Sequence, residues 1–207
     1  MNNKRTVRDG YNAIAPAYLA ARSTDSEDVR LLGDFIPRLP PGAQVLDAGC
    51  GAGVPITRIL SQTFQVVGAD FAEAQLRLAR RLVPLAKFVC QDITKPGFPD
   101  SVFDAICSYY AIIHIPREEH EALFLRFHRM LKPSGLAFLC LGAEDLETDV
   151  DENYLGTRMF WSHYDAGTNL RLIRGCGFEI VWSKVVADAT SPGSGHLFVL
   201  AGKERAE

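Results

Sequence analysis

The sequence predicts an α/β protein in which a parallel sheet is covered by helices on both faces. The chain has 207 residues, of which 47% are hydrophobic and 23% are charged, as expected for one globular domain. Beyond residue 40, short and nearly continuous apolar runs alternate with stretches whose apolar residues recur at helical spacing. Apolar strands separated by helices are typical of parallel sheets buried on both faces. We therefore expect a single domain, residues 1–207, built as an open α/β sandwich.

The elements follow from these runs in order. Apolar runs predict strands over residues 44–47, 64–69, 87–90, 102–108 and 136–141. Amphipathic spacing predicts helices over residues 54–61, 72–83, 117–131 and 165–174. A turn is expected at residues 132–135, and Gly175 or Gly177 is expected to close the last helix. Two final strands, residues 178–186 and 196–201, are expected to pair with each other.

Two segments fall outside this alternation. The first 40 residues are helical in pattern and precede the sheet. Residues 143–164 begin with an acidic stretch and continue with aromatic residues. Because long irregular insertions in compact domains are usually functional or disordered, we expect two cap pieces of the same domain. These are a helical cap at about 1–40 and a lid-like insertion at about 143–164.

Composition excludes several classes of function. A net charge of −3 disfavours an extended nucleic-acid surface. Five scattered cysteines indicate neither a disulfide framework nor a zinc site, and they favour a reducing compartment. Histidines at metal-binding spacing are missing, so no metal is expected. The polar N-terminus and the lack of an apolar stretch of about 20 residues predict a soluble, cytoplasmic protein without a membrane partner.

A glycine-rich turn follows the first predicted strand. Gly49, Gly51 and Gly53 form a G-x-G-x-G pattern just before a predicted helix. Ligands of open α/β sheets bind at the carboxyl ends of strands, and glycines let a ligand approach the backbone closely. Val54 stands where a dinucleotide site would have its third glycine. The turn therefore favours a nucleoside without a pyrophosphate.

Acidic residues end the next two predicted strands. Asp70 closes the second strand, where a carboxylate can accept hydrogen bonds from both ribose hydroxyls. The alternative is a helix cap. Asp92 ends the third strand, where it could accept a hydrogen bond from an exocyclic amino group or simply be a turn residue.

With these features in place, the chain resembles the class I S-adenosylmethionine-dependent methyltransferases, especially the small-molecule group similar to quinone-biosynthesis methyltransferases. The matching motifs are VLDAGCGAG at 45–53, VVGAD at 66–70, CQDI at 90–93, FDAICS at 103–108 and LKPSG at 131–135. The match covers residues 11–141, with a looser match to 203. The resemblance implies a Rossmann-like three-layer sandwich with a seven-stranded, mostly parallel sheet whose last strand is antiparallel. It also implies S-adenosylmethionine as the cofactor.

The resemblance also implies roles for individual residues. The three glycines would cradle the amino-acid portion of the cofactor, with Asp47 near its ammonium group and Ser108 and Tyr109 beneath the methionine part. Asp70 would bind the ribose hydroxyls, and Phe71 would pack on the adenine. Asp92 and the amide of Ile93 would read the adenine edge.

Residues 11–18 resemble the Y-D-x-x-A-x-x-Y helix that folds over the cofactor in this group. Tyr11 and Tyr18 are about two helical turns apart and share a face, either as cofactor contacts or as ordinary packing. Asn12 replaces the usual acid, and Pro16 could bend the helix or lie near its start. Ala72 occupies a position where the group commonly has a serine cap.

Two histidines are candidate general bases, which methyl transfer needs only if the nucleophile arrives protonated. His114 lies in the segment that leaves the fourth strand, and His163 lies just before a predicted helix. A structural role is the alternative for both. His120 and His128, on the long predicted helix, are expected at the surface.

The predicted function is methyl transfer to an O, N or S nucleophile of a small molecule. The segment after the fourth strand lacks the N-P-P-Y type signature of amino-nitrogen methylation on nucleic acid. One alternative is a non-catalytic S-adenosylmethionine-binding or regulatory protein of the same fold. Another is a nicotinamide-dependent oxidoreductase, which the missing third glycine disfavours. The accepting atom and the oligomeric state are left open.

Overall fold

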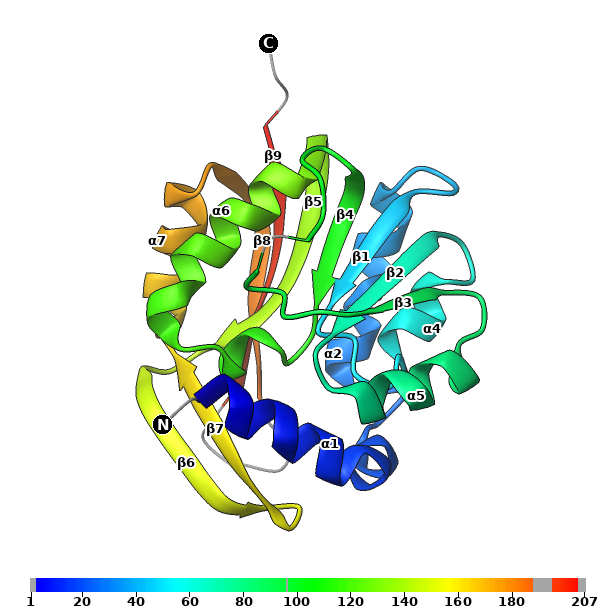
Figure 1. The fold of residues 1–207 in the computed structure, drawn as a ribbon. Helices are drawn as coiled ribbons and strands as arrows, with labels where there is room; N and C mark the ends of the chain where they lie inside the picture. The colour runs from blue at the N-terminus through cyan, green and yellow to red at the C-terminus, as the bar shows by residue number, and fades with distance from the viewer. Residues whose placement is uncertain (1–2, 96, 188–194, 205–207) are drawn as a thin grey trace.

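A seven-stranded sheet forms the centre of the computed structural model, which describes residues 3–95, 97–187 and 195–204 (Figure 1). Its order is β3-β2-β1-β4-β5-β9-β8. The strands are β1 (Gln44–Ala48), β2 (Gln65–Asp70), β3 (Lys87–Cys90), β4 (Phe103–Ser108), β5 (Leu131–Gly142), β8 (Phe178–Ala187) and β9 (Gly195–Lys203). Strands β1 to β5 pair in parallel, and β9 pairs antiparallel with both β5 and β8. The predicted seven-stranded sheet with an antiparallel last strand is confirmed.

Both faces of the sheet are buried because its central strands are apolar on both sides. Val45 and Leu46 are neighbours in β1, yet they belong to different hydrophobic clusters because successive side chains point to opposite faces. One cluster is completed by α6 (His120–Met130) and α7 (Ala166–Gly175). The other is completed by α2 (Glu27–Arg30), α3 (Leu32–Phe35) and α4 (Ile56–Leu60). These two layers of helices make the predicted three-layer sandwich.

The remaining helical segments lie at the ends of strands. Helix α5 (Glu73–Leu82) follows β2, and the short 3₁₀ segments are η1 (Ile36–Arg38), η2 (Ile112–His114) and η3 (Arg117–Glu119). Asp165 caps α7 by accepting a hydrogen bond from the Thr168 amide at 3.0 Å. After that helix, Gly177 takes a φ of +89°. The predicted turn at 132–135 lies within β5 as a bulge, since Leu131 pairs with Phe103 and Leu136 with Ala105.

The insertion after β5 is a hairpin with two shifts in its pairing register, which corrects the expectation of a segment without strands. Strands β6 (Leu146–Tyr154) and β7 (Thr157–His163) pair antiparallel as a separate two-stranded sheet. Leu155 and Gly156 both have positive φ in the connecting turn. The acidic β6 lacks the apolar alternation that marks a half-buried strand, because only Leu146, Val150 and Tyr154 are partly buried and the residues between them are exposed.

Helix α1 (Asn3–Ala21) lies across the end of the sheet toward which β4 points, and β7 runs beside it (Figure 1). Val7 and Ile14 of α1 pack with Met159 and Phe160 of β7 in a third hydrophobic cluster. Pro16 lies inside the helix rather than near its start. The cap and the hairpin therefore cover the same end of the sheet. In the described residues, no helix is both long and apolar enough to cross a membrane.

Candidate functional site

The glycine turn after β1 is held in a conformation that favours glycine. Gly49, Gly51 and Gly53 have φ values of +82°, +52° and +73°. A Cβ atom on Gly49 would lie 2.2 Å from the Cβ of Ala111. The turn can therefore approach the segment after β4 only because position 49 has no side chain.

Asp70 joins this turn to the start of α5. Its Oδ2 accepts a hydrogen bond from the Gly51 amide at 2.9 Å, and its Oδ1 accepts one from the Ala72 amide at 2.8 Å. Burial raises the pKa of this carboxyl, and the backbone hydrogen bonds oppose that rise. A carboxylate has about four acceptor positions, and the backbone amides near Asp70, including that of Phe71, do not use all of them. Asp70 thus stabilises the local backbone and still has lone pairs for a ligand.

A cavity opens beside Asp70 and beneath α1. Its empty volume is about 650 Å³, counting the space at its mouth that is open to solvent. The lining includes ten of the residues singled out from the sequence: Tyr11, Tyr18, Gly49, Gly51, Asp70, Phe71, Asp92, Ile93, Tyr109 and His114. Residues distant in sequence therefore meet at one place.

A second, smaller cavity adjoins the first, and the two share Tyr18, Tyr109 and the glycine turn. Asp47 lies here, where burial raises the pKa of its carboxyl to about 7. Its Oδ2 accepts a hydrogen bond from Thr57 Oγ1 at 2.5 Å. Arg22 also lines this cavity, with its guanidinium 4.6 Å from the ring centre of Tyr110.

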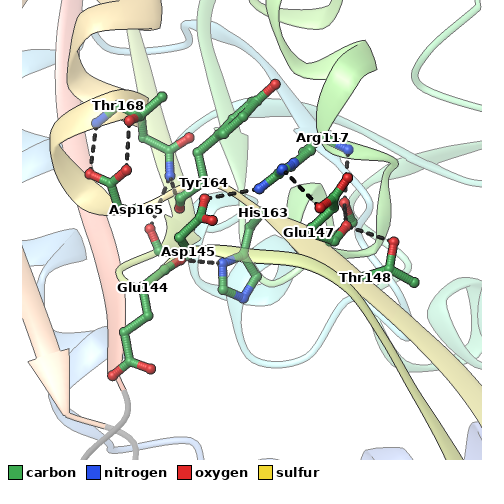
Figure 2. A network of polar contacts seen from close by, with 12 residues as sticks. Arg117, Glu144, Asp145, Glu147, Thr148, His163, Tyr164, Asp165 and Thr168 are labelled. Carbon is green, nitrogen blue, oxygen red and sulfur yellow. Dashed lines mark hydrogen bonds and ion pairs between the residues drawn. The ribbon is translucent and has the colours of Figure 1, made fainter.

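Three residues singled out from the sequence lie outside the lining of both cavities. Gly53 shapes the turn, and Ser108 is fully buried and donates a hydrogen bond to the Ala48 carbonyl at 2.8 Å. The Nδ1 of His163 lies 2.8 Å from the Glu144 carbonyl oxygen, to which it donates, at the base of the hairpin. Figure 2 shows His163 in the polar network around Arg117, Asp145 and Glu147.

His114 is held between the cap and the hairpin. Its Nδ1 lies 2.7 Å from the carbonyl oxygen of Phe160, and its Nε2 lies 2.8 Å from the hydroxyl of Tyr11. A carbonyl only accepts, so Nδ1 carries the proton and Nε2 accepts from Tyr11. Burial lowers the pKa of His114 to about 4. The ring is therefore neutral near pH 7.

The expectation that His120 lies at the surface is wrong. His120 is 1% exposed, and its Nε2 donates to the carbonyl oxygens of Ile112 and Ile115. Both carbonyls belong to the segment around η2, against which the first turn of α6 packs. The helical pattern alone did not show that this segment folds back over the polar end of the helix. His128, in contrast, is half-buried.

Sequence reasoning missed the residues by which α1 attaches. Lys4 donates to Thr94 Oγ1 at 2.6 Å and pairs with Glu119 at the mouth of the first cavity. Asn12 Oδ1 accepts from the Ala74 amide at 2.9 Å. Asn12 and Asp70 thus cover amides at the start of α5, where no serine cap is present.

Comparisons with known proteins agree with this geometry. A protein-family model described as a methyltransferase domain matches residues 45–135. A 2-methyl-6-phytyl-1,4-hydroquinone methyltransferase of Synechocystis is 38% identical over 104 residues, which cover 47% of this chain and 31% of that protein. The family model and this relative support the resemblance to the class I S-adenosylmethionine-dependent methyltransferases, and S-adenosylmethionine is the cofactor that the resemblance implies.

Two further proteins, one curated relative and one solved structure, are similar to this chain. A sterol 24-C-methyltransferase of Gibberella zeae is 31% identical over 175 residues, which cover 74% of this chain and 45% of that protein. The chain spans less than half the length of the curated relatives named here. A 1,6-didemethyltoxoflavin-N1-methyltransferase of Burkholderia thailandensis, solved with S-adenosylhomocysteine, shares the fold with a TM-score of 0.75 at 19% identity. That alignment covers 97% of this chain and 88% of the solved one.

The residues of the two cavities fit S-adenosylmethionine. At Gly51 the turn leaves room that a Cβ atom would fill, and the buried Asp70 keeps acceptor capacity beside it. The Arg22 guanidinium lies in the adjoining cavity, where it suits a carboxylate. In the described part of the chain, no group of three or more His, Cys, Asp or Glu side chains could hold a metal ion.

Proposed function

We propose that this protein transfers a methyl group to an O, N or S nucleophile of a small molecule. One observation carries the proposal: the glycine turn, Asp70 and the Tyr11–His114 pair line the same cavity. The glycine turn and Asp70, which can bind a nucleoside, therefore line the same cavity as the Tyr11–His114 pair, which can accept a proton.

The cofactor-binding half of the proposal assigns each group by its chemistry. Asp70 would accept hydrogen bonds from the ribose hydroxyls, Phe71 would pack on the adenine, and Asp92 with the Ile93 amide would bind the adenine edge. In the adjoining cavity, Arg22 would bind the carboxylate of the amino-acid portion, and Asp47 would lie near its ammonium group. When bound, S-adenosylmethionine supplies a methyl group activated on a sulfonium sulfur.

The acceptor half is lined by rings rather than by free charges. Tyr11, Tyr18, Tyr110 and His114 surround the part of the cavity beneath α1. The cation at the mouth, Lys4, is already paired with Glu119. Rings with a few hydrogen-bonding atoms suit an uncharged apolar or aromatic acceptor that presents one nucleophilic atom.

Tyr11 and His114 would handle the proton of that nucleophile. The Tyr11 hydroxyl can pass its proton to His114 Nε2 while its oxygen takes the proton of the nucleophile. The resulting imidazolium keeps Nδ1–H on the Phe160 carbonyl oxygen. A proton taken up by His114 restores the positive charge that the cavity loses on methyl transfer, which offsets the cost of charging a buried ring.

His163 is a weaker candidate for this role. Its ring lies outside the lining of both cavities, and its Nδ1 is engaged by the Glu144 carbonyl. We propose that it fixes the base of the hairpin.

Similar proteins support a small-molecule acceptor without fixing the accepting atom. The relatives carry names for a sterol and a hydroquinone, and the solved neighbour was crystallised with 1,6-didemethyltoxoflavin. The sterol relative is named for methylation at carbon. Cytoplasmic location and the absence of a nucleic-acid partner stay predictions.

Calorimetry with S-adenosylhomocysteine, followed by a screen of phenols, amines and thiols with methyl-labelled S-adenosylmethionine, tests the proposal. We expect micromolar binding and a methylated product for one class. Absence of binding would refute the cofactor assignment. Binding without turnover of any acceptor would favour the non-catalytic alternative, and a carbon-methylated product would overturn the proposed accepting atom.

A further inference from the structure

Gln75 of α5 has a buried amide group without a hydrogen-bond partner. The residue is 1% exposed, and within the described residues neither Oε1 nor Nε2 meets a donor or an acceptor. Gln75 nevertheless lines the first cavity together with Asp70 and Gly51. Its Oε1 lies 3.7 Å from the position that a Cβ atom on Gly51 would occupy. The buried amide therefore lies beside the glycine turn, in the lining of the cavity that Asp70 also lines.

This arrangement is costly for the protein without a ligand. Burying an amide without its hydrogen bonds is unfavourable, whereas an apolar side chain of similar volume would carry no such penalty. Leu76 and Ala79 on the same helix are buried and apolar, so the surroundings would accept such a residue. The unpaired amide becomes favourable only if something that enters the cavity supplies its partners.

Helix capping does not explain the glutamine. The amides of Ala72 and Ala74 at the start of α5 are covered by Asp70 Oδ1 and Asn12 Oδ1. The Leu76 amide donates to the Ala72 carbonyl. The Gln75 side chain is thus not needed to cap these amides.

We propose that Gln75 binds the ribose hydroxyls of the cofactor together with Asp70. This inference rests on the proposed function, because it assigns Gln75 to the same site. A hydroxyl both donates and accepts, whereas an ionised carboxylate only accepts. One hydroxyl donates to Asp70 and accepts from Gln75 Nε2, and the other hydroxyl donates to Gln75 Oε1. Together the two side chains match a vicinal diol, and they discriminate against ligands that lack one hydroxyl.

The test compares Gln75→Leu with the wild-type full chain. We expect the affinity for S-adenosylhomocysteine, measured by calorimetry, to fall about 10-fold or more. The melting temperature without ligand should stay the same or rise, because an unpaired buried amide has been removed. The variant should lose less affinity for analogues of S-adenosylhomocysteine that lack the 2′- or the 3′-hydroxyl, because each analogue can make only one of the two contacts with Gln75.

Two further variants complete the test, one a conservative change of Gln75 and the other a control outside the cavity. Gln75→Glu preserves the shape but cannot donate when ionised, so it should lose affinity like Gln75→Leu. Gln62→Leu, at an exposed glutamine outside the cavity, is the matched control and should bind like the wild type. Unchanged affinity of Gln75→Leu would overturn the inference, as would an equal loss for the natural ligand and both deoxy analogues. Failure of the wild type itself to bind would instead refute the proposed function.

Discussion

The hydroxyl of Tyr11 lies 2.8 Å from Nε2 of His114, although 103 positions separate the two residues in the chain. Tyr11 belongs to α1, and His114 belongs to η2, which follows β4. On its other side the imidazole binds the carbonyl oxygen of Phe160 in β7. The imidazole ring of His114 thus connects the helical cap, the segment after the central strand β4 and the hairpin. It also lines the first cavity.

Tyr11→Phe should lower kcat about 100-fold, because it removes only the hydroxyl that relays the proton. The affinity for S-adenosylhomocysteine should change less than about twofold, because the ring remains in place. Tyr164→Phe is the control, since Tyr164 stacks on Arg117 outside the cavity lining. Steady-state kinetics and calorimetry measure both effects, and undiminished kcat in Tyr11→Phe would remove this hydroxyl from the reaction.

His114→Gln should reduce turnover at least as strongly as Tyr11→Phe, since it removes the final proton acceptor. His163→Gln should keep kcat and lower the melting temperature slightly, because only the bond to the Glu144 carbonyl is lost. The pair separates the two candidate bases in one assay. An inactive His163→Gln with wild-type cofactor affinity would restore His163 as the base.

Asp70→Ala should weaken binding of S-adenosylhomocysteine about 100-fold or more, since hydrogen bonds to charged groups contribute about 1.5–3 kcal/mol each. The variant also loses the contacts to the Gly51 and Ala72 amides, so its melting temperature must be measured alongside. Asp34→Ala, at an exposed aspartate, is the control. Equal affinity in the folded Asp70→Ala protein would refute the ribose assignment.

Arg22→Gln should weaken S-adenosylhomocysteine about 10- to 100-fold and leave adenosine binding unchanged, because only the former has a carboxylate. Arg30→Gln is the matched control, since Arg30 is exposed and paired with Asp25. Competition calorimetry with the two ligands reads out the difference. A parallel loss for both ligands would place Arg22 away from the amino-acid portion.

Acid should destabilise the fold partly through His120, whose pKa burial lowers to about 4. Between pH 6.5 and 4 the unfolded chain binds a proton that the folded chain does not, so the free energy of unfolding falls as pH falls. The full difference is on the order of 3 kcal/mol. Asp47, whose pKa is raised to about 7, acts in the opposite direction, and it does so equally in the wild type and in a variant of His120.

His120→Gln should therefore lose stability less steeply than the wild type over this pH range. Urea unfolding at several pH values gives the two slopes, and their difference cancels the contribution of Asp47. Parallel slopes would show that His120 does not titrate differently in the folded and unfolded chains.

The strands of the large sheet were predictable because their burial on both faces leaves nearly continuous apolar runs. The predicted strand at 87–90 coincides with β3, and the two final strands pair as expected. Hairpin β6–β7 escaped this reasoning, because its stability comes from packing of Met159 and Phe160 on α1 rather than from alternation in both strands. The burial of His120 escaped it for a similar reason, because its partners are carbonyl oxygens before the helix.

The sequence by itself determined the order along the chain of the seven strands of the large sheet, the glycine turn and the acid at the end of β2, because each follows from local periodicity or backbone conformation. The tertiary structure decided which side chains share a space. It placed His114 against Tyr11 and removed His163 from the cavity, and it left the amide of Gln75 buried without a partner. Such contacts join segments that are distant along the chain, and they depend on how the cap and the hairpin pack across the end of the sheet (Figure 1).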